Sequence, residues 1–292
     1  MMDEVKDSAV HSSAPKSPCD VGVDVGATLA KIAIRDASGE LSFESLPATE
    51  IARLGQRISS LAPEQLGVTG GGASRLAELL EIPCRRHDEF TAWGAGARRL
   101  LDPKTWSGDA PSLLISLGTG TSVLKMDADS TSYVGGTAVG GGTILGLSSA
   151  MLGTTNFDEI CALAQAGDRT QVDLMVSDIY RPGEIHLPDD LSASAFGKLG
   201  LMSNSPGGKE PENLAAAILA LVGETVGQIV GGLSYVTQAE QIIFAGSTLR
   251  DNPFLRDVLA ARTRLMGRKP LFLPHCEFGG ATGALVLCDR KD

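Results

Sequence analysis

Apolar residues follow two alternating patterns along the chain. Short runs rich in Val, Ile and Leu predict buried strands, and apolar positions repeated every three or four residues predict helices. The predicted strands lie at 21–25, 29–34, 39–43, 65–69, 83–87, 113–117, 122–126, 241–245 and 270–273. The predicted helices lie at 51–61, 73–80, 90–101, 144–152, 156–166, 172–180, 210–235, 252–266 and 279–287. Strands that alternate with helices indicate an α/β architecture.

The central stretch, residues 113–146, contains two glycine turns. The first joins two strands into a hairpin, and the second precedes a helix; the turn residues are Gly118, Thr119, Gly120 and Thr121, then Gly140, Gly141, Gly142 and Thr143. Residues without a Cβ let the N–H groups of a turn point at one anion, and a helix N-terminus also attracts an anion. Each turn alone is more simply explained by chain reversal. Together they predict one nucleotide held between them.

A third glycine turn lies within residues 21–34, between two strands. A strand after the glycine excludes a Walker A loop and a dinucleotide fingerprint, both of which lead into a helix. A carboxylate in this apolar strand is costly unless it is paired, and a hydrated Mg²⁺ that bridges to ATP phosphates would pair with Asp24. Asp24 is equally well explained as a turn cap, and Lys31 faces either phosphate or solvent. The turn between them consists of Gly26, Ala27 and Thr28.

Two acidic residues, Asp88 and Glu89, stand where a predicted strand leads into a helix. Ligands of α/β proteins gather at such strand ends. A kinase that acts on an alcohol needs a carboxylate there to orient the hydroxyl group and accept its proton. Acidic residues at a helix start also stabilise the helix dipole. From spacing alone this structural role is preferred for both residues, and Asp88 is the more natural cap.

The segment 210–235 reads as one long apolar helix, preceded by a Ser/Gly/Pro linker at 203–209. Gly223, Gly227 and Gly231 recur at every fourth position, which lets a second helix approach closely. This pattern predicts packing in the core or between subunits. The longest uninterrupted apolar run, 214–222, is too short to span a bilayer.

Composition narrows the function classes. The 292 residues fit two modest domains or one large domain, and 43% hydrophobic with 21% charged residues is typical of a globular enzyme. The formal net charge of −10 disfavours nucleic acid or an anionic membrane as a partner. The five scattered cysteines show no zinc-binding spacing, so we expect reduced structural thiols. Residues 1–18 predict a disordered tail without an apolar signal segment, which favours a cytoplasmic protein.

Several motifs together make residues 20–288 similar to the type II pantothenate kinases. These belong to the superfamily of acetate and sugar kinases, heat-shock 70 proteins and actin. The motifs are VDVGATLAK, VTGGGA, DEF, SLGTGTS, VGGTAVGGGTILGL, AQAGDRTQVDLMVSDIY, IIFAGSTLRDNPFLR and GGATGAL. The resemblance implies two ribonuclease H-like lobes, at 19–110 and 111–292, with ATP between them. It also implies that pantothenate is phosphorylated to 4′-phosphopantothenate, the first committed step toward coenzyme A.

The resemblance also implies roles for individual residues. Glu89 falls at the position of the catalytic base, which reverses the structural role preferred above, and Asp24 lies near Mg²⁺. Thr119, Ser122 and Tyr133 fall at substrate positions. The long helix would form a homodimer interface. The residues placed against the nucleotide are Asp24, Gly26, Ala27, Thr28, Lys31, Gly118, Thr119, Gly120, Gly140, Gly141, Gly142, Thr143, Ile144, Phe157, Gly246 and Ser247.

The chain departs from the family pattern in two places. Family members carry an arginine for the pantothenate carboxylate just before the VGG stretch, where this chain has Ser132 and Tyr133. Loss of such a charge-assisted pair weakens carboxylate binding. Pantetheine, which has no carboxylate, is therefore an alternative substrate, unless Arg98 or Arg99 reaches the site. Leu271-Phe272 replaces the paired tyrosines of some bacterial relatives, so regulation by coenzyme A or its thioesters does not follow from the resemblance.

Two other functions stay open at this point. One is a kinase for a sugar or another small alcohol; the absence of the Cys/His zinc cluster of many bacterial sugar kinases argues against it. The other is a nucleotide-binding regulator without catalysis, which the missing arginine allows. Asp24, Glu89 and the intact second turn argue against this regulator.

Overall fold

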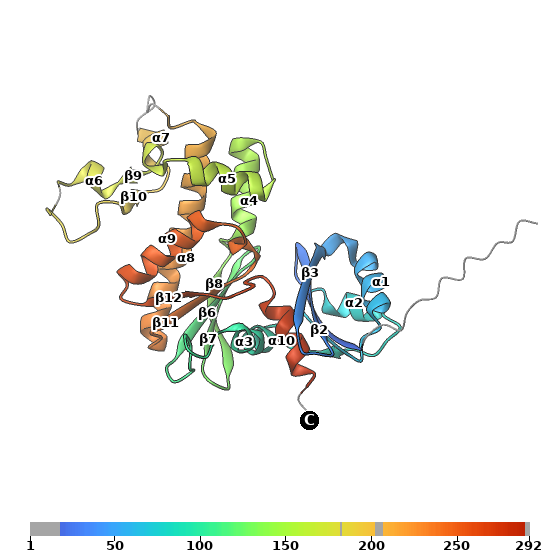
Figure 1. Ribbon diagram of the computed structural model, residues 1–292. Coiled ribbons are helices and arrows are strands. Elements are labelled where there is room, and N and C mark those ends of the chain that lie inside the picture. Colours follow the sequence, from blue (N-terminus) through green and yellow to red (C-terminus); the bar gives the residue numbers. More distant parts are fainter. Residues whose placement is uncertain (1–17, 182, 202–206, 290–292) are drawn as a thin grey trace, which may run out of the picture.

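The computed structural model describes residues 18–181, 183–201 and 207–289, so the predicted tail and most of the predicted linker lie outside the described residues. Two lobes, each built on a five-stranded sheet, make up this α/β fold (Figure 1). The first lobe contains β1 (Cys19–Val25), β2 (Leu29–Asp36), β3 (Leu41–Pro47), α1 (Ile51–Leu61), β4 (Gln65–Thr69), α2 (Ala73–Leu79) and β5 (Arg85–Arg86). Helix α3 (Glu89–Leu100) follows it.

The second lobe is longer and includes an inserted segment between the helix that ends at Ala166 and the helix that begins at Pro211. Its sheet is formed by β6 (Ser112–Leu117), β7 (Thr121–Met126), β8 (Thr131–Thr137), β11 (Gln241–Ala245) and β12 (Lys269–Phe272). Its longer helices are α4 (Gly141–Leu152), α5 (Phe157–Ala166), α8 (Pro211–Thr237), α9 (Pro253–Leu265) and α10 (Gly279–Leu287). The short elements are η2 (Arg169–Gln171), β9 (Leu174–Met175), α6 (Val176–Ile179), β10 (Ser192–Ser194), α7 (Gly197–Leu201) and η3 (Ser247–Leu249).

Both sheets are arranged in the same way. The first has the strand order β3-β2-β1-β4-β5 and the second the order β8-β7-β6-β11-β12. In each, the first three strands are antiparallel, and the last two continue parallel to the third. The repeat explains why each lobe opens with a hairpin whose turn is rich in glycine. The predicted two-lobe α/β fold is confirmed.

Helices α3 and α10 pack closely against each other between the two sheets (Figure 1). Glycines make this approach possible: a Cβ at Gly96 would overlap the carbonyl of Gly279, and one at Gly283 would overlap the carbonyl of Ala92. Helix α10 also packs on β1 and β4, where Gly22 lies against it. The end of the chain, which we expected within the second lobe, therefore covers the sheet of the first lobe.

The glycine stripe of α8 packs within this chain. Gly223 and Gly227 face side chains of α9, the second facing Arg262, and Gly231 faces Met266, which directly follows α9. Helix α8 has 27 residues and is long and apolar enough to cross a membrane, contrary to the expectation from its longest apolar run. However, 72% of its most apolar 18-residue window is buried in the protein. A core helix gives the same pattern, because burial in protein and burial in lipid select the same side chains.

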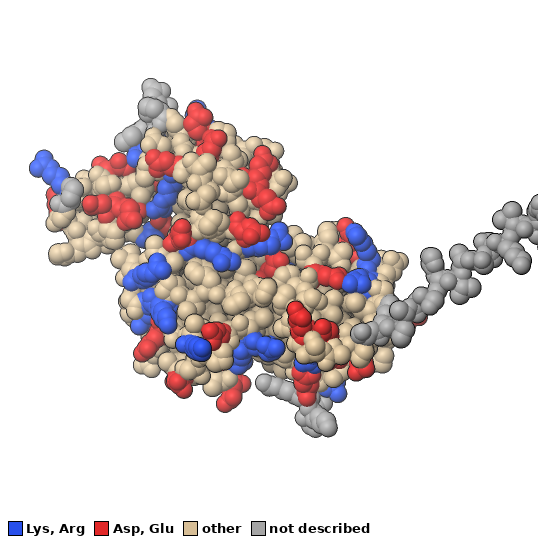
Figure 2. Space-filling view, viewed as in Figure 1, with Lys and Arg blue, Asp and Glu red and all other residues tan. Residues whose placement is uncertain are grey.

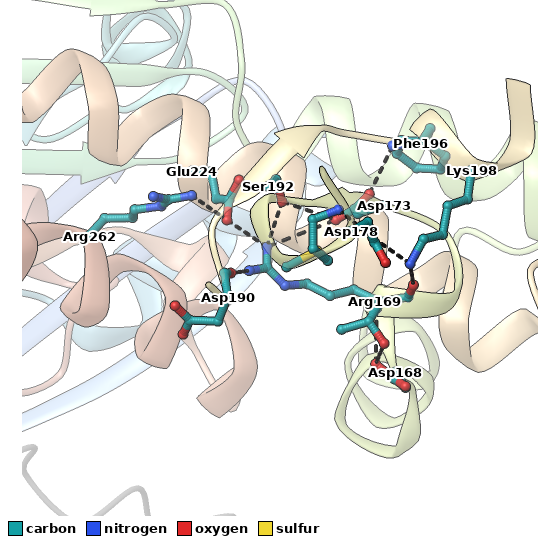
Figure 3. A network of polar contacts seen from close by, with 12 residues as sticks. Asp168, Arg169, Asp173, Asp178, Asp190, Ser192, Phe196, Lys198, Glu224 and Arg262 are labelled. Atoms are coloured by element: carbon teal, nitrogen blue, oxygen red, sulfur yellow. Dashed lines mark hydrogen bonds and ion pairs between the residues drawn. The ribbon is translucent and has the colours of Figure 1, made fainter. Parts of the chain in front are cut away.

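One sequence prediction of secondary structure is wrong, and one edge strand of the second sheet was not predicted. Residues 172–180 do not form one helix but contain β9 and the short helix α6. The buried Asp173 accepts a hydrogen bond from the backbone of Phe196 (2.8 Å) and faces Arg169, and these contacts compete with helix formation. Figure 3 shows this polar network of the inserted segment, which reaches Glu224 on α8. Strand β8 was not predicted, because it is a half-exposed edge strand with two glycines and no apolar run.

Candidate active site

A cavity of about 540 Å³ lies between the lobes and collects most of the predicted site residues. Figure 2 shows the notch between the lobes, with acidic and basic side chains intermixed on this face. The residues lining the cavity include Asp24, Gly26, Ala27, Thr28, Lys31, Glu89, Trp93, Gly118, Thr119, Gly120, Ser122, Tyr133, Gly246 and Ser247. Segments far apart in the sequence therefore form one site.

The two hairpin turns meet at the wall of the cavity, and both contribute residues to its lining. The hydroxyl groups of Thr28, in the β1–β2 turn, and Thr119, in the β6–β7 turn, are 3.0 Å apart and share a hydrogen bond. The β6–β7 turn is closed by the Gly118 amide, which donates to the Gly120 carbonyl at 2.9 Å. Turns of this kind, one from each lobe, can point backbone N–H groups at a single elongated anion, such as a triphosphate, in the adjoining cavity.

Asp24 and Lys31 are two buried residues of opposite charge beside the first turn. They are directly opposite in the β1–β2 register, and their exposed fractions are 4% and 8%. Burial raises the pKa of Asp24, and the positive charge of Lys31 opposes that shift. Two glycines make room for this carboxylate: a Cβ at Gly70 or Gly280 would come within 2.5 Å of its oxygens. The predicted desolvation of Asp24 is thus present.

Glu89 is the first residue of α3, and its neighbour Asp88 caps the helix. The Asp88 carboxylate accepts hydrogen bonds from the backbone N–H (2.8 Å) and hydroxyl (2.9 Å) of Thr91, as expected from the sequence. Glu89 lines the cavity instead. The cavity walls desolvate its carboxylate and raise its pKa, Asp24 raises it further, and Lys31 opposes the shift. A carboxylate of raised pKa accepts a proton more readily in the site than in water.

The second glycine turn of the central stretch supports the first turn. The Gly141 amide donates to the Gly118 carbonyl (2.9 Å) and the Gly142 amide to the Thr119 carbonyl (2.8 Å). These two amides therefore already have hydrogen-bond acceptors within the protein. A Cβ at Gly140 would come within 2.8 Å of Gly120, so glycine permits the close contact.

Six predicted nucleotide contacts are absent from the cavity lining: Gly140, Gly141, Gly142, Thr143, Ile144 and Phe157. Ile144 is fully buried in the main hydrophobic core, and Phe157 packs against that core. The sequence pattern did not show that the second glycine turn is hydrogen-bonded to the first. Contact of these residues with a nucleotide stays a prediction.

Aromatic side chains contribute to the lining of the cavity. Trp93 is buried in its wall, and Tyr133 stacks on Phe90 with ring centroids 5.0 Å apart. Arg98, one suggested replacement for the family arginine, donates instead to the Asp127 carbonyl (2.9 Å), the Ser130 carbonyl and the Thr131 hydroxyl (3.0 Å). Neither Arg98 nor Arg99 lines the cavity, and Lys31 is the one cation among its described lining residues.

A preformed metal cage is not found in the described part of the chain, where no group of three His, Cys, Asp or Glu side chains could hold an ion. Mg²⁺ in nucleotide sites is usually held by one or two carboxylates together with substrate phosphates and water. The single buried carboxylate of Asp24, placed beside both glycine turns, fits this kind of site.

Comparison with solved structures supports the fold. The chain is similar to the activator of 2-hydroxyisocaproyl-CoA dehydratase from Clostridium difficile with bound ADPNP, with a TM-score of 0.65, 14% identity, and 92% and 94% of the two chains covered. It is also similar to a ROK family glucokinase from Streptomyces griseus in complex with glucose and AMPPNP, with a TM-score of 0.61, 12% identity, and 94% and 100% covered. These neighbours share the two-lobe fold.

Comparison of sequences gives the family. Residues 34–287 match the Fumble family. The chain is 33% identical over 267 residues to a type II pantothenate kinase of Staphylococcus haemolyticus, covering 91% of this chain and 99% of that protein. It is 34% identical over 268 residues to the enzyme of the same name from Staphylococcus aureus strain USA300, covering 91% and 98%. This chain therefore belongs to the Fumble family, that of the type II pantothenate kinases.

Proposed function

We propose that this protein is an ATP-dependent pantothenate kinase that forms 4′-phosphopantothenate. The observation that carries the proposal is the convergence of the Thr28 and Thr119 turns with Glu89 in one cavity between the lobes. The relatives named type II pantothenate kinase are matched over almost their full length, which supports the same acceptor.

The residues of the cavity divide the work of phosphoryl transfer. The two glycine turns hold the phosphates with backbone N–H groups, and Lys31 neutralises part of their charge. When bound, Mg²⁺ neutralises the phosphate oxygens and orients them, and Asp24 is the residue that would hold it. Gly246 and Ser247 lie against the adenosine. Positioning and charge neutralisation supply most of the catalysis in reactions of this kind.

Glu89 is the general base. Its carboxylate orients the acceptor hydroxyl group and takes up its proton while the new oxygen–phosphorus bond forms and the bond between the γ-phosphorus and the bridging oxygen breaks. ADP leaves, and Glu89 returns the proton to water. Thr119 and Ser122 contact the acceptor, and the Tyr133–Phe90 stack forms its aromatic wall.

The direct test measures ADP release from the purified protein with pantothenate, with an N-acetylhexosamine panel as the alternative acceptors. A thermal scan with ATP alone, pantothenate alone and both ligands accompanies it. A kinase is expected to release ADP only with its acceptor and to be stabilised by both ligands. A non-catalytic regulator would respond to ATP and ignore pantothenate at every concentration.

Pantetheine is a second candidate acceptor. The observation that favours it is that Lys31 is the one cation among the described residues lining the cavity. The charge of Lys31 already acts on the carboxylate of Glu89. A site without a guanidinium group discriminates little between an acceptor with a carboxylate and one without.

We expect Tyr133→Arg to lower the KM for pantothenate about tenfold and to leave the KM for pantetheine within about twofold, because a charge-assisted pair acts only on the carboxylate. Steady-state kinetics with both acceptors measure this. Tyr133→Phe, which keeps the stack on Phe90, is the control. An equal effect of Tyr133→Arg on both acceptors would show that this position does not face the acceptor's carboxyl end.

Other features stay proposals. We propose a cytoplasmic homodimer that uses the exposed end of α8, where Tyr235 and Val236 are 59% and 81% exposed. Light scattering after size exclusion measures the dimer. Regulation by coenzyme A or acyl-CoA is tested by titration of acetyl-CoA into the kinase assay.

A further inference from the structure

The loop between β12 and α10 contains a buried acidic residue that the mechanism does not use. Glu277 is 6% exposed, and its Oε2 atom has no hydrogen-bond partner in the described part of the chain. The nearest opposite charge is Arg250, whose Nη1 lies 3.5 Å from that oxygen. A buried carboxylate with an incomplete set of partners costs stability. Such a group is retained where it contributes something to a site.

The neighbours of Glu277 lead to the nucleotide side of the cavity. The carbonyl of Cys276, the preceding residue, accepts a 2.6 Å hydrogen bond from the Gly246 amide. Gly246 has a φ of 109°, and a Cβ there would overlap the backbone of Leu117, so only glycine fits at this position of the turn. Arg250 follows directly on η3, the short helix that begins at Ser247. Cys276 therefore contacts the start of the Gly246–Ser247 turn, and Glu277 contacts Arg250, which follows η3.

The same turn is connected to the phosphate-binding turn. Thr248, within η3, donates a 3.0 Å hydrogen bond to the Gly118 carbonyl. A displacement of η3 would thus move both the Gly246–Ser247 wall of the cavity and the β6–β7 turn.

The loop also contacts the first lobe. The rings of His275 and Phe278 each lie 4.7 Å from the ring of Phe43 on β3. The positive charge of Lys31 also acts on the Glu277 carboxylate from the first lobe. The loop 275–278 therefore contacts both the first lobe and the Gly246–Ser247 turn of the second lobe. A movement of the first lobe relative to the second would act on that turn through this loop.

We propose that Glu277 is a positioning residue for nucleotide binding, which holds Arg250 and thereby fixes the Gly246–Ser247 turn against the bound nucleotide. The inference rests on the proposed function, in that the nucleotide is the phosphoryl donor of the kinase. It assigns to Glu277 no contact with the acceptor or with the transferred group.

The test compares Glu277→Gln, which keeps the shape and removes the charge, with Glu277→Asp, Arg250→Gln and the double variant. We expect Glu277→Gln to raise the Kd for an ATP analogue and the KM for ATP about tenfold, while kcat and the KM for pantothenate stay within about twofold. Glu277→Asp is expected to restore part of the affinity. Because Glu277 acts through Arg250, the double variant is expected to bind no more weakly than the worse single variant.

Thermal stability separates this role from a structural one. Burial raises the pKa of Glu277, and Arg250 and Lys31 oppose the shift while Asp251 adds to it. The ionised carboxylate is therefore unfavourable to the folded state, and Glu277→Gln is expected to keep or raise the Tm of the nucleotide-free protein while nucleotide binding weakens. Glu44→Gln, which breaks a carboxylate–arginine pair with Arg57 outside the lining of the cavity, is the control and is expected to leave the Kd unchanged.

Two results would overturn the proposal. One is an analogue Kd for Glu277→Gln within twofold of the parent value. The other is a lower Tm with every kinetic constant impaired alike, which is the result of a merely structural residue. Binding is measured by calorimetry without any acceptor, so a parent protein inactive on pantothenate, but with analogue binding that depends on Glu277, would contradict the proposed function and support this inference.

Discussion

Glu89→Gln is expected to lower kcat for pantothenate phosphorylation by about 10²- to 10⁴-fold, the usual contribution of a general base. The amide keeps the size of the side chain but cannot accept the hydroxyl proton. Since Glu89 faces the acceptor and not the phosphate turns in our proposal, the Kd for an ATP analogue is expected to stay within about threefold. Stopped-time assays of ADP release and calorimetric titration of the analogue measure the two quantities.

Asp88→Asn is the matched control for this substitution. Asparagine is also a good N-cap, so the hydrogen bond to the Thr91 amide is retained and α3 is expected to stay intact. The charge of Asp88 raises the pKa of Glu89, although burial and Asp24 contribute more. Its removal lowers that pKa, so the acid limb of the kcat/KM profile is expected to move to lower pH with little loss of maximal rate. Full turnover by Glu89→Gln would show that another group accepts the proton.

The second large effect is expected at the contact of α3 with α10. In Gly283→Ala the new Cβ would overlap the backbone carbonyl of Ala92, and neither helix has a flexible side chain there to move aside. Overpacking of this kind destabilises by about 1–3 kcal/mol and more when backbone must shift. We expect the Tm to fall by at least about 5 °C. Activity is also expected to fall, because α3 carries Glu89 and Gly280 of α10 adjoins Asp24.

Gly146→Ala is the control for a glycine in a helix. Gly146 lies within α4, and a Cβ there would have no neighbour within 4 Å. This substitution is expected to stabilise the protein by about 0.5–1 kcal/mol, because alanine loses less backbone entropy in a helix. Differential scanning calorimetry compares the two variants with the parent chain. An unchanged Tm for Gly283→Ala would mean that the two helices do not approach as closely as described.

Predictions from local pattern succeeded where a short segment carries its own signal. The glycine turns at Gly26 and Gly118 are hairpin turns, as expected, because a glycine between two runs of β-branched or apolar residues is typical of a hairpin turn. Asp88 is the helix cap that its place before α3 suggested. The helix predicted at 210–235 is observed as Pro211–Thr237, since a long apolar repeat is hard to satisfy in any other way.

Local pattern did not reveal hydrogen-bond partners that lie far away in the sequence. The amides of Gly141 and Gly142 looked free for an anion, but carbonyls more than twenty residues away accept their hydrogen bonds. Arg98 looked available for a carboxylate, but the β7–β8 turn holds it. Residues 172–180 had helical spacing, but the buried Asp173 draws the backbone of Phe196 toward it. In each case a tertiary hydrogen bond outweighed a local preference.

The amino-acid sequence by itself determined the alternation of strands and helices, the glycine turns and the family, because each of these depends on neighbouring residues or on motifs kept in order along the chain. Only the tertiary structure decided that Thr28 meets Thr119, that α10 covers the first sheet, and that Glu277 lies buried behind the Gly246 turn. These features join residues that are far apart in the sequence, and no pattern of spacing specifies which distant side chains pack together in a close-packed interior.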